Sequence, residues 1–270
     1  MWIIIALAVF LVVLDLYVMC PSLKAKRCRP FFEKNVYFAH RGLYDNKDIP
    51  ENSLPAFRKA VENGYGIELD VWLTKDKKLV VFHDNDTSRL CGKNLRVKTS
   101  TFEELRSLRL LGTDCVIPTF EEVLEIIGGK VPLVIEIKGE DIDAEVNPYT
   151  SKALENYGGE YVVESFNPYY LSWWKKHRPD VIRGQLAIKN KGKRKLIIRL
   201  RDFILKNMLV NFLSKPDFLS LDFHAKKYYS FRYVMAMGCF PVAWTIKSKE
   251  DLENANDTFK AFIFERGMLV

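Results

Sequence analysis

Short apolar runs rich in Val, Ile and Phe alternate along this chain with segments whose apolar residues are spaced three and four apart. The runs predict β-strands, and the spaced segments predict amphipathic helices. Alternation of the two is typical of a parallel α/β fold. The predicted strands cover residues 36–39, 66–71, 79–82, 131–137, 161–166, 183–188, 217–222, 241–246 and 261–265. The predicted helices cover residues 54–63, 119–128, 148–157, 168–177, 196–213, 228–238 and 249–257.

Nine apolar runs are one more than a (β/α)8 barrel needs. Only Asp76-Lys77-Lys78 separates the end of the second run from the third, and so tight a turn can join only antiparallel strands. The 79–83 segment is therefore predicted to fold back as a hairpin arm, which leaves eight parallel strands. We expect a TIM barrel, with residues 85–117 as a small insertion over its mouth after the hairpin.

Residues 2–19 form one apolar run that only Asp15 interrupts. A membrane-spanning helix needs about 20 such residues, so the length is just sufficient. No basic residue precedes the run, as a signal peptide would require, and four follow it: Lys24, Lys26, Arg27 and Arg29. The positive-inside tendency then predicts a single-pass protein of the cell membrane whose catalytic domain is cytoplasmic. The predicted units are an anchor (1–22), a basic linker (23–35) and a barrel domain (36–270).

The cysteine content and the net charge indicate the redox compartment and the possible binding partners of the protein. Five cysteines without a CxxC spacing favour a reducing compartment and no disulfide framework. The net charge is +7, and eight of the basic residues fall between 189 and 206. That stretch suits either the solvated face of an outer helix or contact with an anionic membrane leaflet. No nucleic-acid recognition motif accompanies it, so nucleic acid is not an expected partner.

Polar residues gather at the ends of three predicted strands. Glu68 and Asp70 are two apart and therefore share one face of their strand. Two neighbouring carboxylates repel each other unless a cation lies between them, which indicates a metal site. Glu136 would add a third oxygen ligand, and Lys138 a donor to an anionic substrate group. Oxygen ligands favour Mg²⁺ or Ca²⁺.

The order of these motifs resembles the glycerophosphodiester phosphodiesterase family. The matching motifs are His40-Arg41-Gly42, Pro50-Glu51-Asn52-Ser53, Glu68-Leu69-Asp70, Val80-Val81-Phe82-His83-Asp84 and Glu136-Ile137-Lys138. Weaker matches follow at 164–166, 215–218 and 243–245. Two positions depart from the family pattern. Lys247 replaces the usual Asn, and Phe264-Glu265 replaces the usual Thr-Asp or Thr-Asn, both where the family contacts the alcohol portion of the substrate.

The resemblance implies metal-dependent hydrolysis of a glycerophosphodiester to glycerol 3-phosphate and an alcohol. His40 and His83 are expected as the acid–base pair, and Glu68, Asp70 and Glu136 as the metal ligands. Arg41 and Lys138 would bind phosphoryl oxygens, or pair with the carboxylates instead. Phe166 and Trp244 would form an apolar wall for glycerol, or pack in the barrel. Glu51 is either a further metal ligand or an acid at a helix N-terminus.

Two alternative functions remain open at this stage. A lysophospholipase D acting on membrane lysophospholipids would suit the anchor and the basic stretch. A catalytically silent membrane scaffold is the alternative from another class. The intact set of two histidines and three carboxylates argues against the scaffold.

Overall fold

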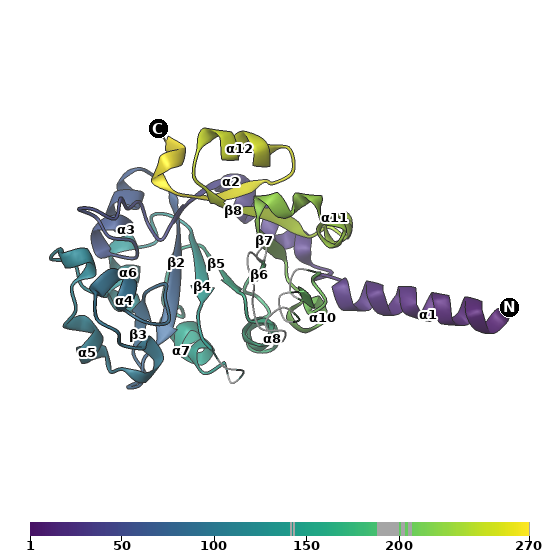
Figure 1. Ribbon diagram of the computed structural model, residues 1–270, viewed down its shortest axis with the longest axis horizontal. Coiled ribbons are helices and arrows are strands. Elements are labelled where there is room, and N and C mark those ends of the chain that lie inside the picture. Colours follow the sequence, from purple (N-terminus) through teal and green to yellow (C-terminus); the bar gives the residue numbers. More distant parts are fainter. Residues whose placement is uncertain (141, 143, 188–199, 201–202, 205–206, 270) are drawn as a thin grey trace.

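A computed structural model describes the chain from residue 1 to residue 269, apart from residues 141, 143, 188–199, 201–202 and 205–206 (Figure 1). Its centre is a closed barrel of eight parallel strands, as the sequence predicts. β1 pairs in parallel with both β2 and β9, and these two pairings close the sheet. The barrel strands are β1 (Tyr37–His40), β2 (Gly66–Leu73), β4 (Leu133–Ile137), β5 (Tyr161–Ser165), β6 (Arg183–Ala187), β7 (Phe218–Asp222), β8 (Phe240–Ile246) and β9 (Ala261–Phe264).

The one strand outside the barrel among the described residues is β3 (Leu79–Val81), which lies antiparallel to β2. Its register pairs Val71 with Val81 and Leu73 with Leu79. The predicted hairpin is therefore confirmed. Its consequence for the site is that the chain returns along β2 and delivers residues 82–84 beside the C-terminal half of that strand.

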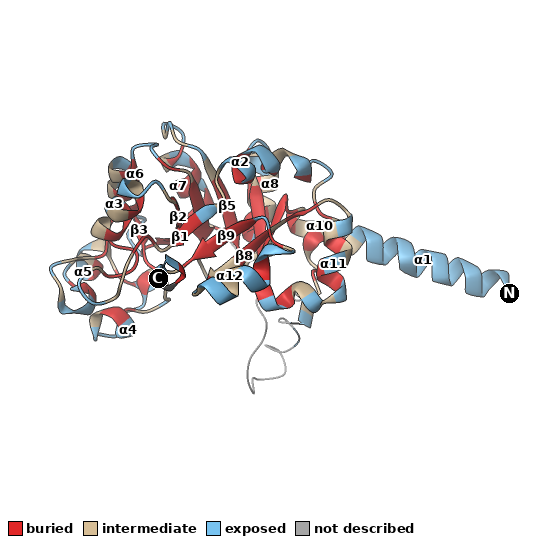
Figure 2. Ribbon diagram, turned by 90° about the horizontal axis from the view of Figure 1, so that it is seen from above, coloured by how far each residue is buried: buried red, intermediate tan, exposed pale blue. Residues whose placement is uncertain are grey.

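Helices surround the barrel and bury their apolar faces against it (Figures 1 and 2). Several begin with a side-chain cap, such as Thr119, which accepts from the Glu122 amide and forms a capping box with the Glu122 side chain. The α-helices around the barrel are α3 (Leu54–Glu62), α6 (Phe120–Ile127), α7 (Val146–Ala153), α8 (Pro168–His177), α10 (Asn211–Ser214), α11 (Tyr229–Ala236) and α12 (Lys249–Asn256); η4 (Phe223–Lys227) and η5 (Arg266–Leu269) are 3₁₀ turns. The basic stretch 189–206 lies outside the described residues apart from 200, 203 and 204.

Residues 85–117 pack against the hairpin. They contain α4 (Ser88–Cys91), η2 (Val97–Thr99), α5 (Phe102–Arg106) and η3 (Leu110–Gly112). Their apolar side chains share a separate small core with the hairpin, made of Trp72, Val80, Phe82, Leu90, Val97, Leu105, Leu110 and Ile117. The segment therefore extends the β2–β3 side of the molecule and brings α4 close to the strand ends.

The N-terminal end of the barrel is closed by the segment before β1, which forms η1 (Ala25–Cys28) and α2 (Arg29–Lys34). Phe32 is fully buried, and its ring centroid lies 4.9 Å from that of Phe218 and 5.0 Å from that of Phe240. Glycine is required in the wall at position 184, since a Cβ there would lie 2.1 Å from the Phe218 ring.

An ion pair ties the same segment to the barrel, with Arg27 Nη2 2.7 Å from the buried Asp217 Oδ2. The sequence predicts a linker at 23–35, but these residues are folded into the barrel end. We therefore propose that the catalytic domain begins near Ser22 rather than at residue 36.

The helix α1 (Trp2–Met19) extends away from the barrel and is exposed over most of its length (Figures 1 and 2). It is long and apolar enough to cross a membrane, and a signal sequence would have the same properties. An exposed apolar surface of this extent indicates a segment that is covered by a lipid or protein environment.

Candidate active site

The His-Arg-Gly motif is a tight turn at the end of β1. Arg41 and Gly42 both have left-handed φ angles, of 53° and 81°. A Cβ at Gly42 would lie 2.9 Å from backbone and side-chain carbon atoms of Ala56, so only glycine fits. The turn directs the Arg41 amide toward β2, where it donates to Glu68 Oε2 over 3.1 Å. The motif thus fixes the backbone beside the first carboxylate.

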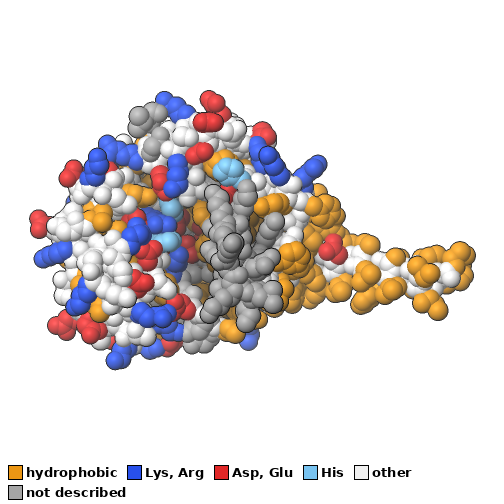
Figure 3. Space-filling view, viewed as in Figure 1, with side chains coloured by type: hydrophobic (Ala, Val, Ile, Leu, Met, Phe, Trp, Pro, Cys, Tyr) orange, Lys and Arg blue, Asp and Glu red, His pale blue; other side chains and the backbone are white. Residues whose placement is uncertain are grey.

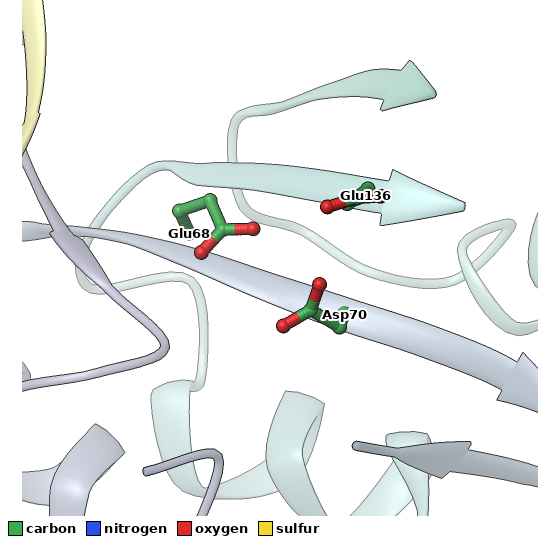
Figure 4. Close-up of side chains that lie close together, drawn as sticks. All are labelled: Glu68, Asp70 and Glu136. Carbon is green, nitrogen blue, oxygen red and sulfur yellow. The ribbon is translucent and has the colours of Figure 1, made fainter. Parts of the chain in front are cut away.

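Three carboxylates meet on the neighbouring strands β2 and β4. Glu68 and Asp70 share one face of β2, and Glu136 is the register partner of Asp70 on β4 (Figure 4). One oxygen from each lies within 4.8 Å of the others, and all three residues are buried. Burial, with the negative charges of Asp70 and Glu136, raises the pKa of Glu68 well above its ordinary value. Three such groups are stable together only if a cation lies nearby or one of them keeps its proton.

The oxygens of this cluster fit a divalent cation. Carboxylate oxygens are the ligands that Mg²⁺ and Ca²⁺ prefer. Among the described residues, Asp70 Oδ1 is buried and accepts no hydrogen bond, and Lys138 Nζ forms an ion pair with it at 3.4 Å, so this oxygen can bind a cation. Asp70 Oδ2 is held by Asn52, whose Nδ2 donates to it over 2.8 Å. A partner of this kind orients a metal ligand from behind.

The two predicted phosphoryl-binding cations lie against the same acids. Lys138 Nζ is 3.0 Å from Glu136 Oε1 and 3.4 Å from Asp70 Oδ1. Arg41 Nη1 donates to Glu51 Oε1 over 2.6 Å, and its Nε is 3.7 Å from Asp70 Oδ2. Burial alone would raise the pKa of Asp70, but the charges of nearby His83, Lys138 and Arg41 hold it well below its usual range. Arg41 and Lys138 are therefore both paired with acids in the structure.

His40 lies between the carboxylate cluster and the last strand. Its Nε2 is 3.9 Å from Glu68 Oε2, and its Nδ1 is 3.4 Å from Glu265 Oε1. Burial lowers the pKa of His40 to about 4. The imidazole is consequently neutral near pH 7. Glu265 also pairs with Lys247, whose Nζ lies 3.2 Å from its Oε1.

His83 is held in a similar way from the opposite side. Its Nδ1 is 2.6 Å from Asp84 Oδ1, and Asp84 Oδ2 accepts from Arg89 Nε over 2.6 Å. Arg89 also binds both oxygens of Glu51, over 2.7 and 2.9 Å. Glu51 is thus the acid that joins Arg89 and Arg41, and it lies outside the carboxylate cluster of the metal site. Because Asp84 contacts Nδ1 of His83, Nε2 is the nitrogen left for proton transfer.

The aromatic residues predicted to contact glycerol lie side by side. The ring centroids of Phe166 and Trp244 are 5.8 Å apart with an interplanar angle of 83°. Both side chains are partly exposed. A hollow of about 510 Å³ opens nearby, with His83, Arg89 and Lys138 in its lining. Figure 3 shows histidine side chains in a hollow flanked by basic and acidic groups. Neither ring lines that hollow, and Trp244 packs against the core, so contact of the rings with glycerol stays a prediction.

Four residues in this arrangement carry no prediction of function from the sequence: Asn52, Arg89, Glu164 and Glu265. Asn52 belongs to the Pro-Glu-Asn-Ser motif, and Glu164 ends an apolar run, so both had a local signal. Burial, with the charge of Glu136, raises the pKa of Glu164 well above its ordinary value. Glu265 was noted only as part of a departure from the family pattern, and its contact with His40 was not predicted. Arg89 has no local signal, because its role depends on contacts with distant parts of the chain.

Comparison with known proteins decides the family. The model of the "Glycerophosphoryl diester phosphodiesterase family" matches residues 40–261. The chain belongs to this family. It is accordingly a glycerophosphodiester phosphodiesterase by family, a class of phosphoric diester hydrolase. The buried acidic triad is consistent with the divalent metal site typical of such enzymes.

Individual relatives agree with the family. A glycerophosphodiester phosphodiesterase of Caldanaerobacter subterraneus subsp. tengcongensis is 41% identical over 166 residues, which cover 57% of this chain and 67% of that protein. The crystal structure of a glycerophosphodiester phosphodiesterase from Thermotoga maritima has a TM-score of 0.65 and 26% identity, covering 87% of this chain and 96% of that one. An Oleispira antarctica phosphodiesterase in complex with sn-glycerol 3-phosphate has a TM-score of 0.70 and 22% identity, covering 87% and 94%. The last of these likenesses supports the fold alone.

Proposed function

We propose that this protein hydrolyses glycerophosphodiesters to glycerol 3-phosphate and an alcohol, with His40 and His83 as the acid–base pair. One observation carries the proposal. Each of two histidines presents Nδ1 to a carboxylate at the barrel end where three further buried carboxylates meet. This geometry leaves two imidazole nitrogens for proton transfer beside a cation site.

The residues divide the work of the reaction. Neutral His40 has a lone pair on Nε2 and accepts the proton of the attacking hydroxyl. His83 donates a proton to the leaving oxygen. Arg41 and Lys138 bind phosphoryl oxygens from positions that their acidic partners fix. The rings of Phe166 and Trp244 cover the glycerol carbons.

Glu68, Asp70 and Glu136 would hold Mg²⁺ or Ca²⁺, which neutralises charge on the phosphoryl group when bound. Their oxygens are hard ligands, and no sulfur or imidazole ligand belongs to this cluster of the described residues. Isothermal titration calorimetry on the full chain in detergent would show which of the two ions binds more tightly.

The proposed activity is tested by coupled detection of glycerol 3-phosphate. The full chain is incubated with glycerophosphocholine and glycerophosphoethanolamine, with and without Mg²⁺ or Ca²⁺. We expect release that requires the ion. A folded protein that binds the ion but releases no product from either substrate, or from lysophospholipid, would support the silent scaffold instead.

For localisation, we propose that α1 is a single membrane span and that the barrel is cytoplasmic. Support comes from the exposure of α1 and from the basic residues that follow it. Such an anchor also favours lysophospholipase D activity on membrane lysophospholipids as a second candidate. Retention in the membrane after a high-salt wash, with the barrel protected from external protease in sealed cells, is the expected result. Digestion from outside intact cells would reverse the orientation.

A further inference from the structure

The end of α1 is attached to the barrel without a flexible joint. Four hydrogen bonds join it to the α10–β7 segment, one of them from Lys215 Nζ to the Tyr17 carbonyl over 3.4 Å. Asn211 Nδ2 donates to the Met19 carbonyl over 2.9 Å, and Lys215 Nζ donates to the Cys20 carbonyl over 3.1 Å. The Ser22 amide donates to the Pro216 carbonyl over 2.9 Å. The carbonyls that a helix leaves free at its C-terminus are thus bonded to the barrel.

Side chains reinforce the attachment. The Tyr17 ring lies 6.1 Å from the Phe212 ring, and Lys215 Nζ lies 5.1 Å from the centre of the Tyr17 ring. Met19 is 3% exposed within the main core. The last turn of α1 therefore packs on the barrel surface, and only residues 2–16 extend freely from it.

The part of α1 that extends from the barrel is shorter than the hydrocarbon core of a bilayer is thick. At 1.5 Å per residue, residues 2–16 measure about 22 Å, and the whole helix about 27 Å. The hydrocarbon core of a bilayer is about 30 Å thick. A span made by α1 must therefore draw the barrel directly against the membrane surface.

The barrel surface next to this attachment carries tyrosines and basic residues, the types that are common where proteins meet a membrane surface. We name as the α11 surface Lys227, Tyr229, Arg232 and Tyr233, which line a hollow of about 500 Å³. Tyr229 is 72% exposed and stacks on Tyr233 at 5.6 Å. In Figures 1 and 2, α11 lies beside the base of α1. Tyrosines gather at membrane interfaces, and Lys and Arg there attract anionic lipids.

The charge within the apolar run lies toward the barrel end of α1. Asp15 is four residues before the end of the helix at Met19. At 1.5 Å per residue, it lies about 6 Å from that end. In a membrane-spanning α1 the carboxylate would therefore be near the interface rather than at the bilayer centre, where a charge costs most.

On the premise that α1 spans a membrane, as proposed above, we infer that the α11 surface lies in the headgroup layer of the same bilayer and binds anionic lipid. The orientation has a consequence for the site. In Figure 3 the hollow with histidine side chains faces the viewer while α1 lies across the view. The mouth of the barrel then opens along the membrane surface.

Photocrosslinking on the full chain tests this contact. Benzoylphenylalanine is placed at Tyr229, and at Tyr149 as the matched control, in vesicles of phosphatidylcholine with or without phosphatidylglycerol. Tyr149 is 37% exposed on α7, which lies away from α1 in both ribbon views. We expect lipid adducts at 229 and none at 149. Arg232→Glu should reduce the adduct with phosphatidylglycerol and leave that with phosphatidylcholine unchanged.

The outcomes separate this inference from its premise. Protein that resists an alkaline wash but forms no adduct at 229, or forms equal adducts at 229 and 149, overturns the docking while the anchor stands. Protein that the wash removes overturns the span and the docking together. Hydrolysis of soluble glycerophosphodiesters is independent of either result.

Discussion

His40 Nδ1 lies 3.4 Å from Glu265 Oε1, and the same oxygen lies 3.2 Å from Lys247 Nζ. Lys247 and Glu265 lie in the two segments where the sequence is expected to depart from the family pattern, Lys247 and Phe264-Glu265, and the structure brings them together beside His40. Their positive and negative charges neutralise each other. Among the described residues His40 Nδ1 has no hydrogen-bond partner, but the nearby carboxylate favours the tautomer that keeps the proton on Nδ1 and the lone pair on Nε2. We therefore expect this pair to position His40.

Glu265→Gln should lower kcat by about 10- to 100-fold with little change in KM, because the outer partner of a positioned imidazole contributes about that much. Glu265→Asp, which keeps the charge, should recover part of the loss. Steady-state kinetics on both variants checks this. A change confined to KM would assign Glu265 to substrate binding instead.

Alanine at His40 or at His83 should each reduce kcat by about 10²-fold or more, since general acid–base catalysis typically contributes that much. His177→Ala is the matched control, because His177 is exposed on α8 and bonds only locally to the Trp173 carbonyl. Circular dichroism verifies the fold of each variant. Near-normal turnover after either substitution would remove that histidine from the mechanism.

Chelation should abolish activity, and Asp70→Asn should raise the metal concentration needed for half-maximal rate. The reason is that Asp70 belongs to the carboxylate cluster, and its Oδ1 accepts no hydrogen bond among the described residues while Asn52 holds its Oδ2. Titration of activity with Mg²⁺ and Ca²⁺ measures the shift. Full activity in chelator would leave Arg41 and Lys138 as the electrophiles.

Metal affinity should fall as the pH is lowered from neutrality. The pKa of Glu68 is raised in the metal-free protein, so its carboxyl holds a proton at pH values where an ordinary glutamate has lost it. Metal binding must displace that proton, which costs more as the pH falls. Calorimetry in buffers of different ionisation enthalpy should detect proton release on binding. Affinity that does not change as the pH is lowered from neutrality would contradict this.

Phe32→Ala should destabilise the barrel by about 3–5 kcal/mol, the usual cost of removing a buried Phe side chain. Phe10→Ala is the control, since Phe10 is exposed on α1. Denaturant unfolding of the full chain in detergent gives both values. By the same reasoning, a chain beginning at residue 36 should be less stable than one beginning at Pro21, which keeps Arg27, Cys28 and Phe32.

Local patterns were sufficient to predict the barrel, the β2–β3 hairpin and the pairing of Glu68 with Asp70, because period-two alternation and turn length are read within a few residues. They could not reveal that residues 25–34 close the barrel. Phe31 and Phe32 are a short apolar pair, and their partners Phe218 and Phe240 are about two hundred residues away. The role of Arg89 and the contact of Glu265 with His40 were missed for the same reason, since only the closed barrel brings these residues to the histidines.

Closure of the barrel also sets when the protein can become active during its synthesis. β1 pairs with β9, and Phe32 packs on β7 and β8. The first part of the barrel therefore cannot complete its contacts until the last strands have left the ribosome. Domains generally form as cooperative units once their chain is complete. Glu265, beside His40, directly follows the last barrel strand, β9. A nascent chain can therefore expose α1 to its targeting machinery long before it can hydrolyse any ester.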